Sequence, residues 1–442
     1  MNKKIPFKEI NKLAIPAMLA GIAEPILSMV DTAFVGHLPE FGKESLAAVG
    51  LAGVFLSMLI WILGQTRSAI STIISQYLGA NSLDKVKNLP AQVIFSVVIL
   101  AIIIIALTYP FAPFIFKLYN ADDILLELSV QYYRIRIFGL PFTLFTFAVF
   151  GTFRGLQNTR YPMYIAITGA VLNMVLDYFL IYGITNILPP LGVKGAAYAS
   201  VLAQIVMAVL AGYFLHRKTP IRLKVSFPLN HEMGNLSKMI LHLFVRTIAL
   251  NVALYLGSSF ATKYGKDSIA AYTIAVNIWF FFAFFVDGYS SAGNILSGKL
   301  YGAKSFKQLA QLGKQLTKYS LILGVSIASV SFIFYYPIGK IFIDDQAVLD
   351  QFYSVFWIVL IMQPINGIAF IYDGIFKGLG YMKYLRNVLL IATFVGFVPV
   401  LFVCDYFQLE LLGIWIAFTV WMLFRGGILI YKFGRLPMFL SE

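Results

Sequence analysis

The chain repeats its own residue pattern once, at a fixed distance of 223 residues. Four short segments of the first half return in the second half at this single offset. The pairs are 45–48 with 268–271, 79–80 with 302–303, Pro141 with Pro364, and 153–156 with 376–379. Because the offset stays constant along this much of the chain, it indicates two copies of one architecture.

The composition places both copies in a membrane. Hydrophobic residues make up 60% of the chain and charged residues 12%, and the mean hydropathy is +0.81. A soluble globular protein carries roughly twice that share of charge. Apolar runs of about 20 residues, the length that crosses a bilayer, recur along the chain. They are centred near residues 23, 57, 101, 140, 173, 204, 249, 282, 327, 362, 396 and 421.

These runs predict an all-α integral membrane protein with twelve spans, six in each half. An even number of spans returns the chain to its starting side, so the halves are expected to share one orientation. We expect a first lobe at 1–215, a cytoplasmic connection at 216–235 and a second lobe at 236–442. With all twelve spans in one chain, a monomer is the simplest functional unit.

The net charge of +14 does not indicate a nucleic-acid partner, because the basic residues stand at the ends of the predicted spans. They gather on one side of the twelve-span arrangement, while the loops of the other side are acidic. By the positive-inside rule, both termini are expected to be cytoplasmic in a plasma or inner membrane. The first apolar run lacks a cleavage signal and is expected to remain as a span.

Charged residues inside the predicted spans are the strongest functional signal. Each costs about 2.5–3.5 kcal/mol at the bilayer centre on insertion scales, so it is retained where it faces water or a partner. The predicted spans contain five acids, Glu24, Asp31, Asp177, Asp287 and Asp373. The arginines Arg67, Arg246 and Arg425 lie near or within spans, and Arg134 and Arg136 lie at the fourth span.

In the first half, these acids fall on matching helix faces. Glu24 and Asp31 are seven residues apart on the first predicted helix, and Asn173 and Asp177 are four apart on the fifth. Desolvation and a second carboxylate both raise the pKa of a carboxyl group. Such a cluster can hold a proton near neutral pH and release it when water enters. It can also bind Na⁺, or serve as a static polar contact between helices.

In the second half, Arg246, Asp287 and Asp373 lie on three different predicted helices. An arginine with two aspartates is expected to form either a neutralised structural network or a second cation-facing or gating site. Both interpretations stay open from the sequence alone.

Two prolines of the first predicted helix, Pro16 and Pro25, remove backbone hydrogen bonds and can bend it. No catalytic constellation or phosphate-binding glycine loop occurs, and the single cysteine, Cys404, excludes an intrachain disulfide. We therefore expect neither an enzyme nor a cofactor. The energy source would then be an ion gradient, a partner protein, or none.

Several segments resemble one transporter family. Residues 27–38 resemble the helix 1 signature of the multidrug and toxic compound extrusion (MATE) transporters, 173–177 their helix 5 motif, and 195–200 their helix 6 motif. The 287–289 segment, with Arg246 and Arg67, is similar to the branch that contains DNA-damage-inducible protein F. The resemblance covers nearly the whole chain.

The resemblance implies an antiporter with two six-helix lobes around a V-shaped cavity. It implies export of cationic, amphipathic organic compounds in exchange for H⁺ or Na⁺. Asp31, Asn173 and Asp177 match the family's cation-site positions, Ser200 fits nearby, and Pro16 matches the bend of helix 1. Glu24 and Pro25 depart from the family's pattern, so the resemblance assigns Glu24 no role.

The leading hypothesis is thus an H⁺-coupled exporter of organic cations or other amphipaths, embedded in the lipid bilayer. A Na⁺-coupled exporter would use the same carboxylates. A lipid-linked saccharide flippase of the same superfamily is the next alternative, although such chains tend to have a strongly cationic cavity. A receptor or scaffold would not need buried acids on matched helix faces.

Overall fold

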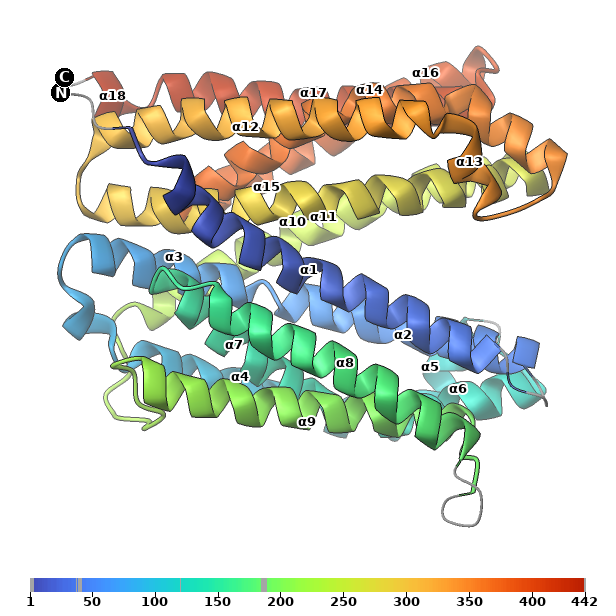
Figure 1. Ribbon diagram of the computed structural model, residues 1–442, viewed down its shortest axis with the longest axis horizontal. Coiled ribbons are helices and arrows are strands. Elements are labelled where there is room, and N and C mark those ends of the chain that lie inside the picture. Colours follow the sequence, from blue (N-terminus) through green and yellow to red (C-terminus); the bar gives the residue numbers. More distant parts are fainter. Residues whose placement is uncertain (1–3, 37, 39–41, 120, 184–188, 441–442) are drawn as a thin grey trace. The chain divides into compact units, whose positions relative to one another are not determined.

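The computed structural model of the chain is helical, and the residues that it describes contain no β-strand (Figure 1). It describes residues 4–36, 38, 42–119, 121–183 and 189–440, with their side chains except at 24–29, 31–33, 42–43 and 439–440. Eleven continuous helical segments of these residues are long and apolar enough to cross a membrane. Together with the 30-residue α1, they correspond to the twelve predicted spans and confirm the all-α membrane fold.

The six spans of the first half are built from the following helices. They are α1 (Phe7–Gly36), α2 (Gly42–Leu63), α3 (Thr66–Gly79), η1 (Leu83–Val86), α4 (Leu89–Thr108), α5 (Ala112–Leu118), α6 (Asp123–Arg136), η2 (Ile137–Gly139), α7 (Leu140–Gly155), α8 (Arg160–Tyr182) and α9 (Val193–Lys218).

The second half continues in the same way. Its helices are α10 (Met233–Lys263), α11 (Lys266–Gly302), α12 (Phe306–Ile333), α13 (Tyr335–Lys340), α14 (Gln346–Gly378), α15 (Met382–Ile391), the π-helical η3 (Ala392–Phe397), α16 (Val398–Tyr406), α17 (Glu410–Gly434) and α18 (Pro437–Leu440).

Three further prolines occupy different positions in these helices. Pro141 stands in the first turn of α7, and Pro399 stands in the first turn of α16, after the π-helical η3. There the missing N–H costs nothing, because first-turn amides lack a helical partner in any case. Pro364 instead lies inside the continuous helix α14.

The chain divides into two compact units. The N-terminal unit holds Leu19–Tyr77 and Ser82–Ile240, and the C-terminal unit holds Leu241–Glu442 with Met1–Met18 and Leu78–Asn81. Helix α1 therefore belongs to both units, with the division after Met18. This makes α1 a covalent and helical link between them.

Within the C-terminal unit, α11 and α14 pack backbone against backbone through small residues. A Cβ on Gly374 would lie 2.2 Å from the Ser290 carbonyl oxygen, and one on Gly378 would lie 2.3 Å from that of Asn294. Glycines four residues apart allow this approach, which is how membrane helices associate where lipid offers no hydrophobic drive. The close packing fixes the face of α14 that carries its charged residues.

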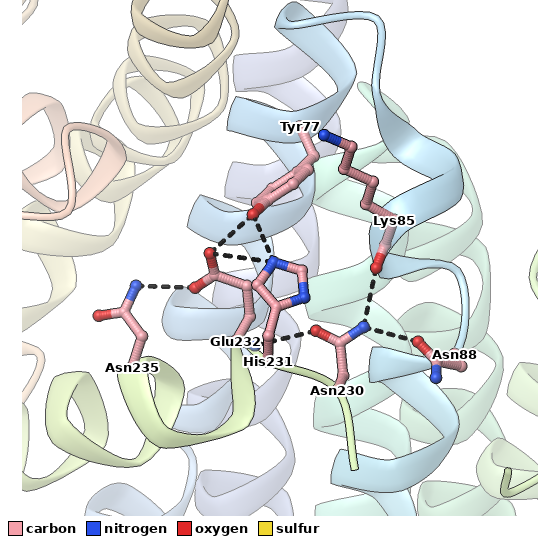
Figure 2. A network of polar contacts seen from close by, with 7 residues as sticks. All are labelled: Tyr77, Lys85, Asn88, Asn230, His231, Glu232 and Asn235. Atoms are coloured by element: carbon pink, nitrogen blue, oxygen red, sulfur yellow. Dashed lines mark hydrogen bonds and ion pairs between the residues drawn. The ribbon is translucent and has the colours of Figure 1, made fainter. Parts of the chain in front are cut away.

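The connection between α9 and α10 is held on the helices of the N-terminal unit by a polar network (Figure 2). The Tyr77 hydroxyl donates to Glu232 Oε1 at 2.8 Å and lies 2.8 Å from His231 Nε2. The Asn230 amide nitrogen donates to the Lys85 carbonyl oxygen, also at 2.8 Å. These bonds order the segment that leads into α10.

Candidate functional site

The polar groups of the first half meet on α8. The Asn173 amide nitrogen donates to Asp177 Oδ2 at 2.8 Å. Asn173 is 3% exposed and Asp177 is fully buried, and both lie within a helix long and apolar enough to cross a membrane. One helical turn separates them, which is the spacing that brings side chains together on a helix. The chain thus keeps an amide–carboxyl pair away from both lipid and bulk water.

Ser200 of the neighbouring helix α9 lies at a similar height. The two helices come close together at Gly195, where an added Cβ would lie 2.4 Å from the Leu180 carbonyl oxygen. Asp177 lies about 4.5 Å from this point along α8, and Ser200 about 7.5 Å along α9. The helices are antiparallel, so both displacements run in one direction. Ser200 is 2% exposed, and α8 packs along α9.

Helix α1 runs beside the same end of α8. The Tyr182 hydroxyl donates to the Phe34 carbonyl oxygen at 2.8 Å, and the Phe34 ring lies edge-on to Tyr178 and Tyr182. The predicted acids Asp31 and Glu24, and Pro25 between them, have side chains outside the described residues. The backbone of α1 is helical through all three.

Pro16, the other predicted bend of α1, lies within the continuous helix and before the division between the units. In this part of α1, Asn11 Oδ1 accepts a hydrogen bond from the Tyr289 hydroxyl of α11 at 2.9 Å. A Cβ on Gly288 would lie 2.6 Å from Met18 Cβ. The first third of α1 is therefore packed tightly on α11.

In the second half, the structure brings Arg246 and Asp373 together and adds a third residue. Arg246 Nη2 of α10 lies 2.5 Å from Asp373 Oδ1, and Lys377 Nζ lies 2.8 Å from Asp373 Oδ2. Both ion pairs are buried, with the Asp373 side chain 5% exposed. Lys377 follows Asp373 by one helical turn, a spacing that could have revealed it.

A second buried arginine, Arg425 of α17, completes this group. It interacts electrostatically with both Arg246 and Asp373. We call Arg246, Asp373, Lys377 and Arg425 the cationic cluster. The sequence placed Arg425 in a span, but gave no signal that it lies near α10 and α14.

The remaining predicted residue of the second half, Asp287 of α11, makes no bond to the cationic cluster. It is half-buried, and among the described residues it makes neither an ion pair nor a hydrogen bond. Its position on the sequence gave no information on the direction of its side chain. Within the described part of the chain, no group of three or more His, Cys, Asp or Glu residues could hold a metal ion.

Comparisons with known proteins identify the family. The MatE family model matches residues 16–179 and 243–403, one match in each half of the repeat. Protein DETOXIFICATION 44, chloroplastic, of Arabidopsis thaliana is 28% identical over 442 residues, covering 94% of this chain and 80% of that protein. DNA damage-inducible protein F of Escherichia coli strain K12 is 26% identical over 432 residues, covering 95% of this chain and 90% of that protein.

Among solved structures, the fold is similar to the crystal structure of the Vibrio cholerae MATE transporter VcmN in the bent form. The TM-score is 0.89 at 19% identity, and the match covers 98% of this chain and 97% of that chain. The matches of the family model span most of the chain. The chain therefore belongs to the MatE family of multidrug and toxic compound extrusion transporters.

Proposed function

We propose that this efflux transporter is an antiporter that exports organic cations and other amphipaths in exchange for protons. The proton site is formed by Asp177 with Asn173, Ser200 and Asp31. The transporter works as a monomer in a plasma or inner membrane. Both termini are cytoplasmic, because the basic residues gather at one set of helix ends.

The observation that carries the proposal is the fully buried Asp177 inside a membrane-spanning helix, bonded to Asn173. An ionised carboxylate is strongly disfavoured in an apolar interior, so the group is neutral there or paired with a cation. Opening the site to water removes that penalty. A carboxyl group that alternates between these surroundings takes up and releases a proton as the transporter changes conformation.

The position of α1 supports a second carboxyl group at the same site. Phe34, which accepts the Tyr182 hydrogen bond, follows Asp31 by three residues. Tyr182 follows Asp177 by five, so both acids lie within about two helical turns of this contact, on the same side of it. Two carboxyl groups in one dry region share a proton more readily than each binds one alone.

Helix α1 then provides the link from proton binding to conformation. Its first third packs on α11 in the C-terminal unit, and the remainder belongs to the N-terminal unit with α8. A proton bound at Asp31 or Asp177 changes the free energy of the N-terminal unit alone. Proton binding can shift the equilibrium between two conformations only as far as the proton's affinity differs between them. Bending of α1 near Pro16 and Pro25 is the proposed motion.

The driving force is sufficient. One pH unit corresponds to about 1.4 kcal/mol for each proton. A gradient of two pH units therefore supports roughly a hundredfold accumulation of substrate when one proton exchanges for one singly charged organic cation. Na⁺ is the alternative coupling ion, because carboxylate, amide and hydroxyl oxygens also suit a hard cation.

The test is ethidium accumulation in everted membrane vesicles, with an acid interior or a Na⁺-loaded interior imposed separately. We expect the acid interior to drive accumulation and Asp177→Asn to abolish it. Asp350→Asn, which makes the same change at an exposed position, should leave accumulation intact. Accumulation driven by Na⁺ alone would refute proton coupling, and undiminished accumulation by Asp177→Asn would refute the site.

A further inference from the structure

The connection between α9 and α10 turns back along α9 as soon as that helix ends. The Thr219 hydroxyl donates to the Leu215 carbonyl oxygen at 2.7 Å and accepts a hydrogen bond from the Ile221 amide at 3.1 Å. Ile221 is 1% exposed, and a Cβ on Gly212 would lie 3.9 Å from Leu223 Cδ1. Gly212 precedes the end of α9 by six residues. Leu223 therefore lies about 9 Å back along the helix from that end.

This depth is that of the boundary between lipid headgroups and hydrocarbon. Helix α9 has 26 residues and is thus about 39 Å long, whereas the hydrocarbon core of a bilayer is about 30 Å thick. A centred α9 extends beyond the core by about 4–5 Å at each end. The connection therefore lies along the membrane surface and does not project away from it.

Basic side chains project from this part of the connection. Arg222 and Lys224 alternate with Ile221, Leu223 and Val225. Both basic side chains are exposed, and among the described residues neither forms an ion pair or a hydrogen bond. Segments 83–88 and 217–232 together hold six Lys and Arg residues against two acids, an excess of four positive charges. Clusters of four to eight basic residues beside a transmembrane helix attract anionic lipid headgroups.

Helix α4 holds Phe227 of the connection in an exposed position. Gln92 Nε2 donates to the Ser226 carbonyl oxygen at 2.6 Å and to the Pro228 carbonyl oxygen at 3.3 Å. Gln92 Oε1 accepts a hydrogen bond from the Asn230 amide at 2.8 Å. Gln92 is 1% exposed, whereas Phe227 is 80% exposed. The backbone on both sides of Phe227 is therefore fixed, although its ring has little contact with the protein.

The exposed apolar surface continues from Phe227 along α4. Phe95 and Ile99 follow Gln92 by three and seven residues, so they share its side of the helix. They are 51% and 40% exposed, and Leu229 of the connection is 57% exposed. An exposed apolar surface bordered by basic side chains is typical of segments that lie in the membrane interface.

We propose that residues 219–230 bind an anionic phospholipid of the surrounding bilayer. The lipid phosphate accepts charge-assisted hydrogen bonds from Arg222 and Lys224, whose apolar stems lie along the membrane surface. The upper acyl chains pack on Phe227 and Leu229. The inference assigns a lipid partner to the N-terminal unit, and it depends on neither the coupling ion nor the exported substrate.

The test places a fluorescent reporter at this surface. Full-length Phe227→Trp protein is reconstituted in nanodiscs of phosphatidylcholine with one-tenth phosphatidylglycerol. Bromine, which quenches tryptophan on contact, is carried on the upper acyl chain of either the phosphatidylglycerol or an equal amount of the phosphatidylcholine. Subtracting the emission of the unsubstituted protein in the same discs isolates the new indole. We expect blue-shifted emission, and quenching by brominated phosphatidylglycerol at least about twofold stronger than by brominated phosphatidylcholine.

Variants of this reporter protein then assign the charge. Arg222→Gln/Lys224→Gln should make quenching by the two brominated lipids about equal, because the anionic lipid is no longer concentrated at the surface. Lys314→Gln/Lys318→Gln provides the matched control, since it removes the same charge from exposed positions of α12. The control should keep the preference for phosphatidylglycerol. All four substituted side chains are exposed, so the fold is expected to tolerate their loss.

Four results would overturn the proposal. Equal quenching by the two brominated lipids in the reporter protein would remove the preference for an anionic headgroup. Emission typical of water would place the indole outside the bilayer. Blue-shifted emission that neither lipid quenches would assign the surface to a protein contact, such as a second copy of this chain. An equal loss of preference in the control variant would reduce the effect to long-range attraction by the whole protein.

Discussion

Replacing Asp373 by asparagine should destabilise the C-terminal unit strongly. The carboxylate accepts Arg246 at 2.5 Å and Lys377 at 2.8 Å in a buried setting. Opposite charges about 4 Å apart attract by about 4 kcal/mol at an effective dielectric constant of 20, so two pairs contribute about 8 kcal/mol. Desolvation of the carboxylate, several kcal/mol, offsets part of this. We expect a net loss of about 3–5 kcal/mol in the free energy of unfolding.

The measurement is reversible unfolding in mixed micelles by titration with sodium dodecyl sulfate. Asp84→Asn provides the matched control, because Asp84 pairs with Lys87 where the two side chains are 83% and 46% exposed. An exposed pair of this kind contributes about 0–1 kcal/mol. In the double variant Asp373→Asn/Arg246→Gln, the cation that Asp373→Asn leaves unpaired is removed as well. Its loss in the free energy of unfolding should therefore be smaller than the sum of the two single losses by about 1 kcal/mol or more.

Two results would refute this reasoning. The first is a loss in Asp373→Asn no larger than that in the exposed control. The second is strict additivity in the double variant, since it would mean that Asp373 and Arg246 do not interact in the folded state.

Three further predictions test the packing, the connection and the pH response. Gly374→Ala should cost about 1–3 kcal/mol by forcing α14 away from the Ser290 carbonyl oxygen, whereas Gly427→Ala, with open space around it, should be neutral in the same titration. Tyr77→Phe should speed trypsin cleavage within residues 219–232, because the network of Figure 2 loses its hydroxyl, and unchanged cleavage would contradict that role. Burial and a hydrogen bond to a nearby aspartate raise the pKa of Tyr264. Its neutral phenol therefore stabilises the fold fully below the ordinary tyrosine pKa near 10, and this contribution declines as the pH rises above it. Tyr264→Phe should flatten the decline in stability above about pH 10, and an equally steep decline would contradict it.

The number and type of spans could be predicted from the sequence because hydrophobic length is a local property. The repeat and the apolar runs placed all twelve. The interruptions could not be predicted in this way. The π-helical η3 depends on Thr393 contacting Trp421 of α17 and Ala249 of α10, which are contacts between distant segments.

The same distinction applies to the candidate sites, because contacts within one helix could be predicted and contacts between helices could not. Asn173 and Asp177 share one helix, so their spacing alone put them on one face, and the structure joins them. Arg246 and Asp373 lie on different helices, and charge balance suggested their grouping. Charge balance also grouped Asp287 with them, yet it bonds to neither. Which faces of separate helices meet is decided by packing such as the glycine contacts of α14, and periodicity does not encode it.

Competition between substrate and proton for the N-terminal unit tests the central claim most directly. Ethidium is added to purified protein in weakly buffered, Na⁺-free solution near neutral pH, and the change in pH is recorded. If the two compete for the protein, linkage predicts release of up to about one proton for each ethidium bound, and much less from Asp177→Asn. No proton release from the wild-type protein, or equal release from Asp177→Asn, would contradict the account.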